Sequence, residues 1–173
     1  MESKTVSIPH PLTTSLRLSL YIAAFMIPLA FNANQIVTGT LVNCLLFLAV
    51  TRLTRKDQIP VIILPSLGAL AHGVLFGPQT IFLYFFLPFI WLGNYILIWA
   101  FTHFSKYNFT LKISAAAIAK YLLLYTAAFI YLRFRLVPPI FLTAMGIVQL
   151  VTALFGGVLS YAVMTITTRY DRH

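Results

Sequence analysis

The residues of this chain with most capacity for chemistry are polar side chains inside otherwise apolar segments. Gln35, Gly39 and Asn43 recur every four residues, so a helix would place all three on one face. Asn94 lies in a later apolar segment and Gln149 in the last one. An amide in lipid costs free energy unless it is hydrogen-bonded. These residues therefore indicate either bonds between helices or a binding site.

The polar residues come from several segments and share a depth. At 1.5 Å per residue, Asn43 and Gln149 lie roughly 12–15 Å below one boundary of the apolar region, and Asn94 about 21 Å. This shared depth favours a small-ligand pocket open to the outer side. The predicted ligand-binding residues are Asn32, Asn34, Gln35, Asn43, His72, Gln79, Trp91, Asn94, Arg133, Arg135 and Gln149.

Each of these residues also has a structural interpretation. The amides Asn43, Asn94 and Gln149 can hydrogen-bond between helices. His72 alone is more often structural than a ligand, and Trp91 is more often a packing residue. The pocket interpretation depends on their common depth and not on any single residue.

Three basic residues have two interpretations each. Arg133 and Arg135 are either anchors at the membrane interface or groups that face an anionic ligand, since guanidinium matches carboxylate and phosphate geometry. Lys120 lies eight residues inside its apolar segment. Its long side chain favours snorkelling back to the inner surface over a position inside the bundle.

The sequence lacks the residues that several kinds of chemistry require. The apolar segments contain no Asp or Glu, which removes the usual ion and proton sites of coupled transporters. No Gly-rich phosphate loop ends in Lys-Ser or Lys-Thr, and no Ser-His-acid arrangement can form. His10, His72, His103 and His173 lack metal-ligand spacing, and the single Cys44 is best explained as a small buried hydrophobe. We therefore predict no enzyme, no cofactor and no metal site.

The composition indicates a lipid environment. Of 173 residues, 60% are hydrophobic and 9% are charged, with three acidic residues and a mean hydropathy of +0.91. Soluble domains carry about a quarter charged residues. The net charge of +9 comes from Lys and Arg in short connecting segments, which is typical of residues that set membrane orientation. We expect contact with membrane lipid and none with nucleic acid.

Six apolar segments predict an all-α integral membrane protein, a single domain over residues 1–173 with a six-transmembrane-helix bundle. Crossing a bilayer takes about 17–25 helical residues. The first three segments are near the lower limit, and the third contains Pro65 and Gly68, so that five spans and one re-entrant piece are the alternative. The predicted spans are residues 16–31, 35–51, 60–76, 80–101, 112–132 and 139–167.

Basic residues predict the orientation of these spans. With the N-terminus inside, nine Lys and Arg lie on the inner side, against Arg133 and Arg135 on the outer side. Lys and Arg concentrate in cytoplasmic loops. Both termini are therefore expected in the cytoplasm, with the chain in a prokaryotic plasma membrane.

Small residues form two helical stripes. Ser15, Ser19 and Ala23 lie four residues apart in the first segment, and the last segment has Gly146, Gln149, Ala153, Gly156 and Ser160. Small residues allow close approach of another helix. We expect one stripe to pack inside the bundle and the other to meet a partner subunit.

The chain resembles the substrate-binding S components of energy-coupling-factor transporters. The resemblance covers most of the chain: its length, six short spans, inner termini and polar outer half. It includes four segments that are similar to small prokaryotic membrane proteins of this superfamily: Asn34 to Thr40, Leu64 to Ala69, Leu75 to Pro78 and Pro88 to Asn94.

The resemblance implies a subunit that captures a vitamin-like molecule outside and docks on a transmembrane coupling subunit with two ATPases. In that family alanines at four-residue spacing on the first helix meet the coupling subunit, and Ser15, Ser19 and Ala23 match the spacing but only partly the identity. The nickel and cobalt members have a metal-binding histidine just after the N-terminus, whereas this chain has Glu2 there, which argues against that branch. The alternative function is a non-catalytic structural or anchoring subunit of a larger membrane complex.

Overall fold

The computed structural model describes residues 10–30, 34–73 and 82–170, with the backbone alone at residues 10–13 and 168–170. Helices hold 86% of the described residues, and no strand occurs among them. The predicted all-helical class is thus confirmed. The helices are α1 (His10–Ala30), α2 (Gln35–Arg52), α3 (Gln58–His72), α4 (Leu83–His103), α5 (Phe109–Arg133), α6 (Ile140–Ala144) and α7 (Ile147–Tyr170).

Four stretches of helix are long and apolar enough to cross a membrane: Gln35–Arg52, Leu83–His103, Phe109–Arg133 and Ile140–Thr167. Two further apolar helices, over Thr14–Ala30 and Gln58–His72, are shorter. The chain is therefore compatible with a membrane protein. Six complete spans, and a cytoplasmic position for both termini, stay predictions.

The last predicted span, 139–167, is two helices in the structure. The separation falls at Met145 and Gly146, where the amide of Met145 donates to Phe141 O at 2.9 Å. A Cβ on Gly146 would collide with Leu142 O and lie 3.0 Å from the Tyr125 ring. The chain can turn from α6 into α7 here because glycine has no Cβ.

The third predicted span, 60–76, appears as α3, which continues through Pro65. It ends at Gly73, whose φ of 67° is a left-handed conformation that favours glycine. The amide of Gly73 donates to Ala69 O at 2.9 Å. Residues 74–76 of this prediction lie outside the described part of the chain.

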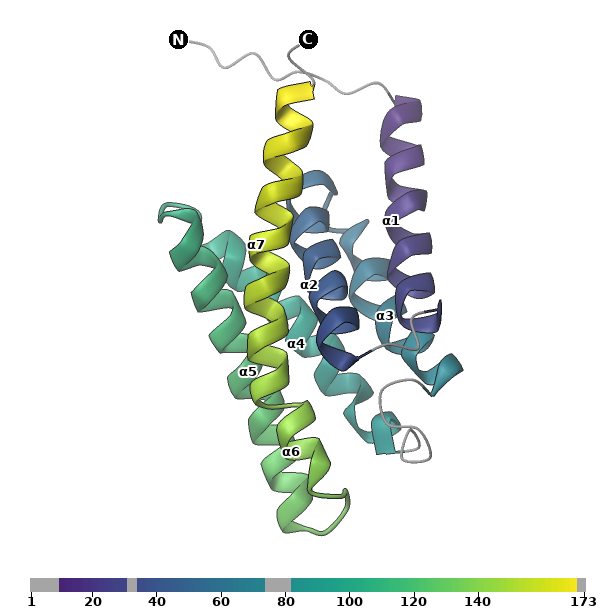
Figure 1. Ribbon diagram of the computed structural model, residues 1–173, viewed down its shortest axis with the longest axis vertical. Coiled ribbons are helices and arrows are strands. Elements are labelled where there is room, and N and C mark those ends of the chain that lie inside the picture. The colour runs from purple at the N-terminus through teal and green to yellow at the C-terminus, as the bar shows by residue number, and fades with distance from the viewer. Residues whose placement is uncertain (1–9, 31–33, 74–81, 171–173) are drawn as a thin grey trace.

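The long helices alternate in direction and lie side by side (Figure 1). We call the end where α1 begins and α7 ends the upper end, as drawn, and the opposite end, where α2 and α4 begin, the lower end. Helix α2 packs chiefly against α7, α1 against α3, and α4 against α5. Residues 35–43, 65–73 and 83–94 consequently share the lower half of the bundle.

Glycines bring particular helix pairs together. A Cβ on Gly156 would lie 2.6 Å from Asn43 Cβ and 2.8 Å from Cys44 N, so α7 touches the backbone of α2. A Cβ on Gly68 would collide with Phe25 O of α1. Both close contacts are possible because glycine has a hydrogen atom where other residues have a side chain.

The two small-residue stripes have different surroundings. Ala153, Gly156 and Ser160 of α7 are buried inside the bundle. On α1, Ser15 and Ser19 are exposed and Ala23 is half-buried. The α1 stripe is therefore left open at its upper part.

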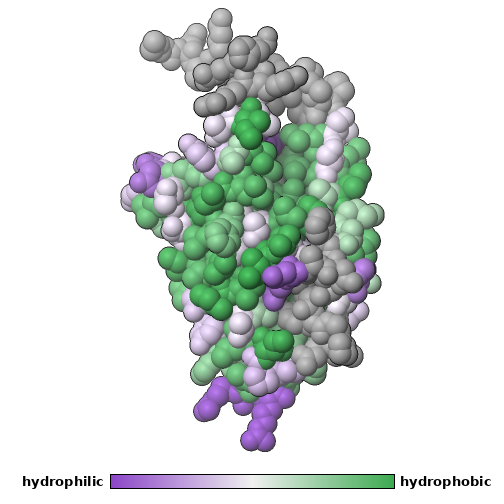
Figure 2. Space-filling model, in the orientation of Figure 1, coloured by the Kyte–Doolittle hydropathy of each residue, from purple (hydrophilic) through white to green (hydrophobic). Residues whose placement is uncertain are grey.

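The surface of the bundle is largely apolar. Figure 2 shows hydrophobic residues over most of the visible middle of the molecule and hydrophilic ones at the lower tip. Large side chains face outward here, including Ile22, Val158 and Ile166, which are 61%, 64% and 68% exposed. In water such a surface would be costly, whereas lipid solvates it.

One ion pair holds the upper end of α1 to the segment before α3. Arg17 Nη1 donates to Asp57 Oδ1 at 3.2 Å, and the Tyr21 hydroxyl donates to Asp57 O at 2.9 Å. Thr54 Oγ1 also donates to Asp57 Oδ2 at 2.7 Å. This hydrogen bond, followed by the Arg17 guanidinium, lowers the pKa of the Asp57 carboxyl.

Candidate functional site

A buried lysine connects three helices in the middle of the bundle. Lys120 of α5 is 3% exposed. Its Nζ donates to Asn43 Oδ1 of α2 and to Asn94 Oδ1 of α4, each at 2.8 Å. The snorkelling prediction for Lys120 is wrong, because these two amide oxygens bind the ammonium inside the bundle.

The two asparagines are themselves held by other helices. Asn94 Nδ2 donates to Ile62 O of α3 at 2.9 Å. Asn43 Nδ2 donates to Gly39 O at 2.8 Å and to Thr152 Oγ1 of α7 at 3.2 Å. Both amide oxygens are thereby turned toward the lysine. We call Lys120, Asn43, Asn94 and Thr152 the lysine network; it links α2, α3, α4, α5 and α7.

The lysine network forms part of the wall of a cavity in the lower half of the bundle. The cavity has a volume of about 70 Å³ and an otherwise mostly apolar wall. Every long helix contributes to it. Its polar lining residues are Gln35, Thr38, Asn43, Ser66, Asn94, Lys120, Gln149 and Thr152, and among its apolar ones are Pro28, Val42, Ile90, Met145 and Val148.

Four of the predicted ligand-binding residues meet at this cavity: Gln35, Asn43, Asn94 and Gln149. Gln35 Nε2 and Gln149 Nε2 both donate to Ala144 O at 3.3 Å, next to the break between α6 and α7. The helical spacing of Gln35 and Asn43 does place them on one face, as predicted. Whether these residues bind a ligand stays a prediction.

Trp91, Asn34 and His72 lie outside the cavity lining. Trp91 is half-buried, and its Nε1 donates at 2.7 Å to Oγ of Ser66, a lining residue. Asn34 is exposed and caps α2, accepting from Ile36 N at 2.9 Å. His72 is the exposed last residue of α3. Trp91 and Asn34 thus make hydrogen bonds within the protein, and His72 lies at an exposed helix end.

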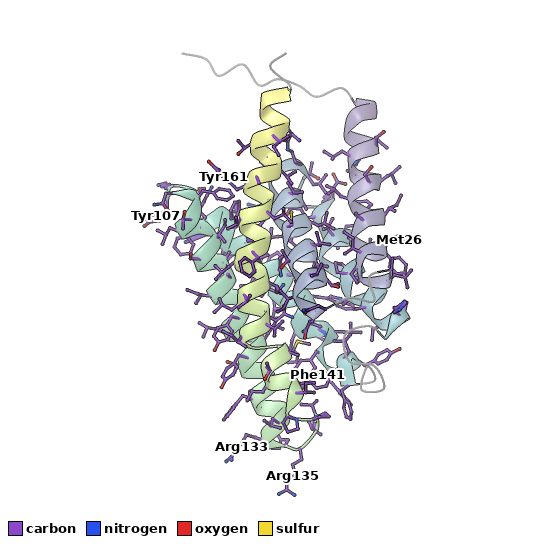
Figure 3. The ribbon with its side chains drawn as sticks, viewed as in Figure 1. Met26, Tyr107, Arg133, Arg135, Phe141 and Tyr161 are labelled. Atoms are coloured by element: carbon purple, nitrogen blue, oxygen red, sulfur yellow. The ribbon has the colours of Figure 1, made fainter. Side chains whose placement is uncertain are left out.

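Arg133 and Arg135 point away from the bundle at its lower tip, where Figure 3 labels them. Both are exposed. Arg133 is thirteen residues from Lys120 on α5, roughly 20 Å along the helix. Packed aromatic rings fill the lower part of the bundle, where Phe86 stacks on Phe141 at 5.2 Å between ring centres. Neither arginine is among the residues that line the cavity, and their role in ligand binding stays a prediction.

Two further predicted ligand-binding residues, Asn32 and Gln79, lie outside the described residues.

Sequence reasoning did not assign Lys120, Thr38, Ser66 or Thr152 to the site. A signal for Lys120 was present. Ala116 and Ala117 precede it by four and three residues, and Leu124 follows by four, so the lysine shares a face with small and apolar residues. That face is the buried face of α5. The position of Lys120 on the packed face was therefore a signal for burial, although the length of its side chain left snorkelling open.

Across residues 10–30, 34–73 and 82–170, no three His, Cys, Asp or Glu side chains come together as a metal site would require. Cys44, the lone thiol, is buried at 5% exposure.

In comparisons with known proteins, no protein-family model, curated protein or solved structure matches the chain. The site must therefore be interpreted from its own chemistry.

Proposed function

We propose that the chain is a substrate-capture subunit of an energy-coupling-factor type importer in a prokaryotic plasma membrane. It binds a small, vitamin-like molecule in the cavity of the lower half. The observation that carries the proposal is the lysine network, a buried cation and two oriented amides on the wall of a cavity. Such a mostly apolar site with a few convergent polar groups is typical of small-molecule binding.

The direction of entry follows from the distribution of charge. With both termini inside, the lower end faces the exterior, and the cavity lies in the half nearer to it. The ligand enters from the outside and the upper end faces the cytoplasm. A coupling subunit with its ATPases then has access to the exposed α1 stripe of Ser15 and Ser19.

Ligand binding requires the cavity to widen. Ligand pockets in proteins measure roughly 300–1,000 Å³, whereas this cavity measures about 70 Å³. The described structure therefore corresponds to a closed state. The break at Met145 and Gly146 adjoins the cavity through Met145, which makes α6 the element best placed to move.

The alternative function is a structural subunit that binds no ligand. The satisfied hydrogen bonds of Asn43 and Asn94 favour it, because interhelical amide bonds also stabilise membrane bundles. Under this alternative the lysine network holds helices together and the cavity stays closed.

Native mass spectrometry of the gently purified protein tests the proposal. We expect a small co-purifying molecule that Asn94→Ala removes and the matched control Gln58→Ala retains, since Gln58 is a buried amide outside the cavity. An empty protein whose thermal stability no vitamin or nucleobase alters would instead support the structural subunit.

A further inference from the structure

The cavity contains a buried amine that has no anionic partner among the described residues. The protonated form of Lys120 has three N–H donors, and two of them are used by the neutral amide oxygens of Asn43 and Asn94. Within the described part of the chain the single acidic residue is Asp57, which pairs with Arg17 at the upper end. No described carboxylate is therefore available to Lys120. A buried cation is expected to have a partner charge.

A second group in the cavity has an unmet bonding capacity. Thr38 is 3% exposed and lines the cavity, and its Oγ1 has no hydrogen-bond partner among the described residues. A buried hydroxyl without a partner is unusual in a native protein. It lies on α2, five residues before Asn43, so it belongs to a different part of the wall from the lysine network.

We infer that the cavity takes an apolar monocarboxylate whose carboxylate pairs with Lys120 and whose binding also uses the hydroxyl of Thr38. The inference rests on the proposed function and specifies the class of ligand. The carboxylate supplies the missing negative charge and accepts the free proton of Lys120. The hydroxyl of Thr38 is a further donor on the wall of the same cavity.

The rest of the wall selects the body of the ligand. Val42, Ile90, Met145 and Val148 are apolar lining residues, and they favour a hydrocarbon chain or ring attached to the carboxylate. One cation and one hydroxyl suit a monoanion. A phosphate dianion would bring more charge and more acceptor oxygens than this wall can match.

The test uses the full-length protein, purified without carboxylate buffers, and measures binding by calorimetry and by the shift of the thermal midpoint. The probes are butyrate, its neutral isostere butyramide, and inorganic phosphate. We expect butyrate to bind at least about tenfold more tightly than butyramide, as a charge-assisted bond predicts, and phosphate not to bind. This comparison needs no variant and is independent of any folding defect.

Two variants locate the interaction. Lys120→Gln should remove the preference for butyrate, while Lys112→Gln should keep it. Lys112 is the matched control because it lies on the same helix and outside the cavity, with its Nζ 4.7 Å from the Phe101 ring centre. Thr38→Val, which keeps the shape of the side chain, should weaken butyrate binding severalfold.

Equal binding of butyrate and butyramide, tighter binding of phosphate, no binding of any probe, or a butyrate preference that survives Lys120→Gln would each overturn the inference. The proposed function is judged separately by the co-purifying molecule. A neutral or cationic molecule there would sustain ligand capture and reject the monocarboxylate.

Discussion

Two hollows among the described residues differ in size, and the smaller of the two has the features of a site. The cavity in the lower half measures about 70 Å³, whereas a groove at the upper end measures about 560 Å³. The groove is formed by the end of α2, the following loop, α3 and α4. Its lining includes Arg55, Gln58, Ile59, Tyr95, Trp99, Thr102 and His103.

The hydrogen bonds of the two hollows differ in how far apart their partners lie in the sequence. In the groove, Gln58 Nε2 donates to Leu53 O and Thr102 Oγ1 to Ile98 O, between residues five and four apart. In the cavity, Lys120 bonds Asn43 and Asn94, which are 77 and 26 residues away. Local bonds form wherever a helix or turn forms. Bonds between distant helices require those helices to be packed in one arrangement, so the cavity is the organised region.

The largest expected effect is in thiol labelling, which shows the side of the membrane that each hollow faces. We replace Cys44 by Ala and introduce one cysteine at an exposed arginine of each end, Arg133→Cys or Arg55→Cys. A membrane-impermeant thiol reagent applied to intact cells should label the Arg133→Cys protein nearly completely and the Arg55→Cys protein only after lysis. The reverse pattern would put the cavity on the cytoplasmic half and exclude capture from outside.

Removing one amide from each hollow should separate their contributions to stability. Asn94→Ala deprives Lys120 of one of its two acceptors and removes the side-chain donor to Ile62 O. The loss should be about 2–4 kcal/mol of unfolding free energy. Gln58→Ala removes one local bond and should cost less than about 1 kcal/mol. Denaturation in mixed micelles measures both; equal losses would remove the distinction between the two hollows.

The next largest expected effect is a loss of stability when the close packing of helices around the cavity is disturbed. Gly156→Ala places a Cβ 2.8 Å from Cys44 N and Thr40 O, and backbone atoms cannot yield without moving α7 from α2. We expect a loss of about 1–3 kcal/mol. Gly93→Ala is the control, since its Cβ would lie 3.4 Å or more from Leu124 and Lys120, an ordinary contact. A harmless Gly156→Ala would contradict the tight contact of α2 with α7.

The smallest expected effect is a loss of thermal stability in acid, caused by protonation of Asp57 at the upper end. The lowered pKa of Asp57 means that its carboxylate stabilises the folded state above the unfolded pKa of about 3.9. That contribution is lost as the pH falls through the folded pKa below this value. The thermal midpoint of the wild type should therefore fall more steeply than that of Asp57→Asn between about pH 5 and pH 3. Parallel curves would show that the interactions of the Asp57 carboxylate with Thr54 and Arg17 contribute nothing measurable.

The sequence by itself determined the all-helical class and the position of most helices. Predicted spans 35–51, 80–101 and 112–132 correspond to α2, α4 and α5 within three residues at each end. Long apolar segments have one way to satisfy their backbone in lipid, which is to form helices. The four-residue spacing of Gln35 and Asn43 likewise fixed their common face, since that depends on helix geometry alone.

The tertiary structure alone decided which polar residues meet. Asn43, Asn94 and Lys120 come from three segments, and no local pattern specifies that their side chains converge. It depends on how α2, α4 and α5 pack, with Gly156 setting one of the close approaches. The same packing left Arg133 and Arg135 outside and turned Lys120 inward. A long side chain can reach either the surface or the interior, and here the two amide oxygens are inside.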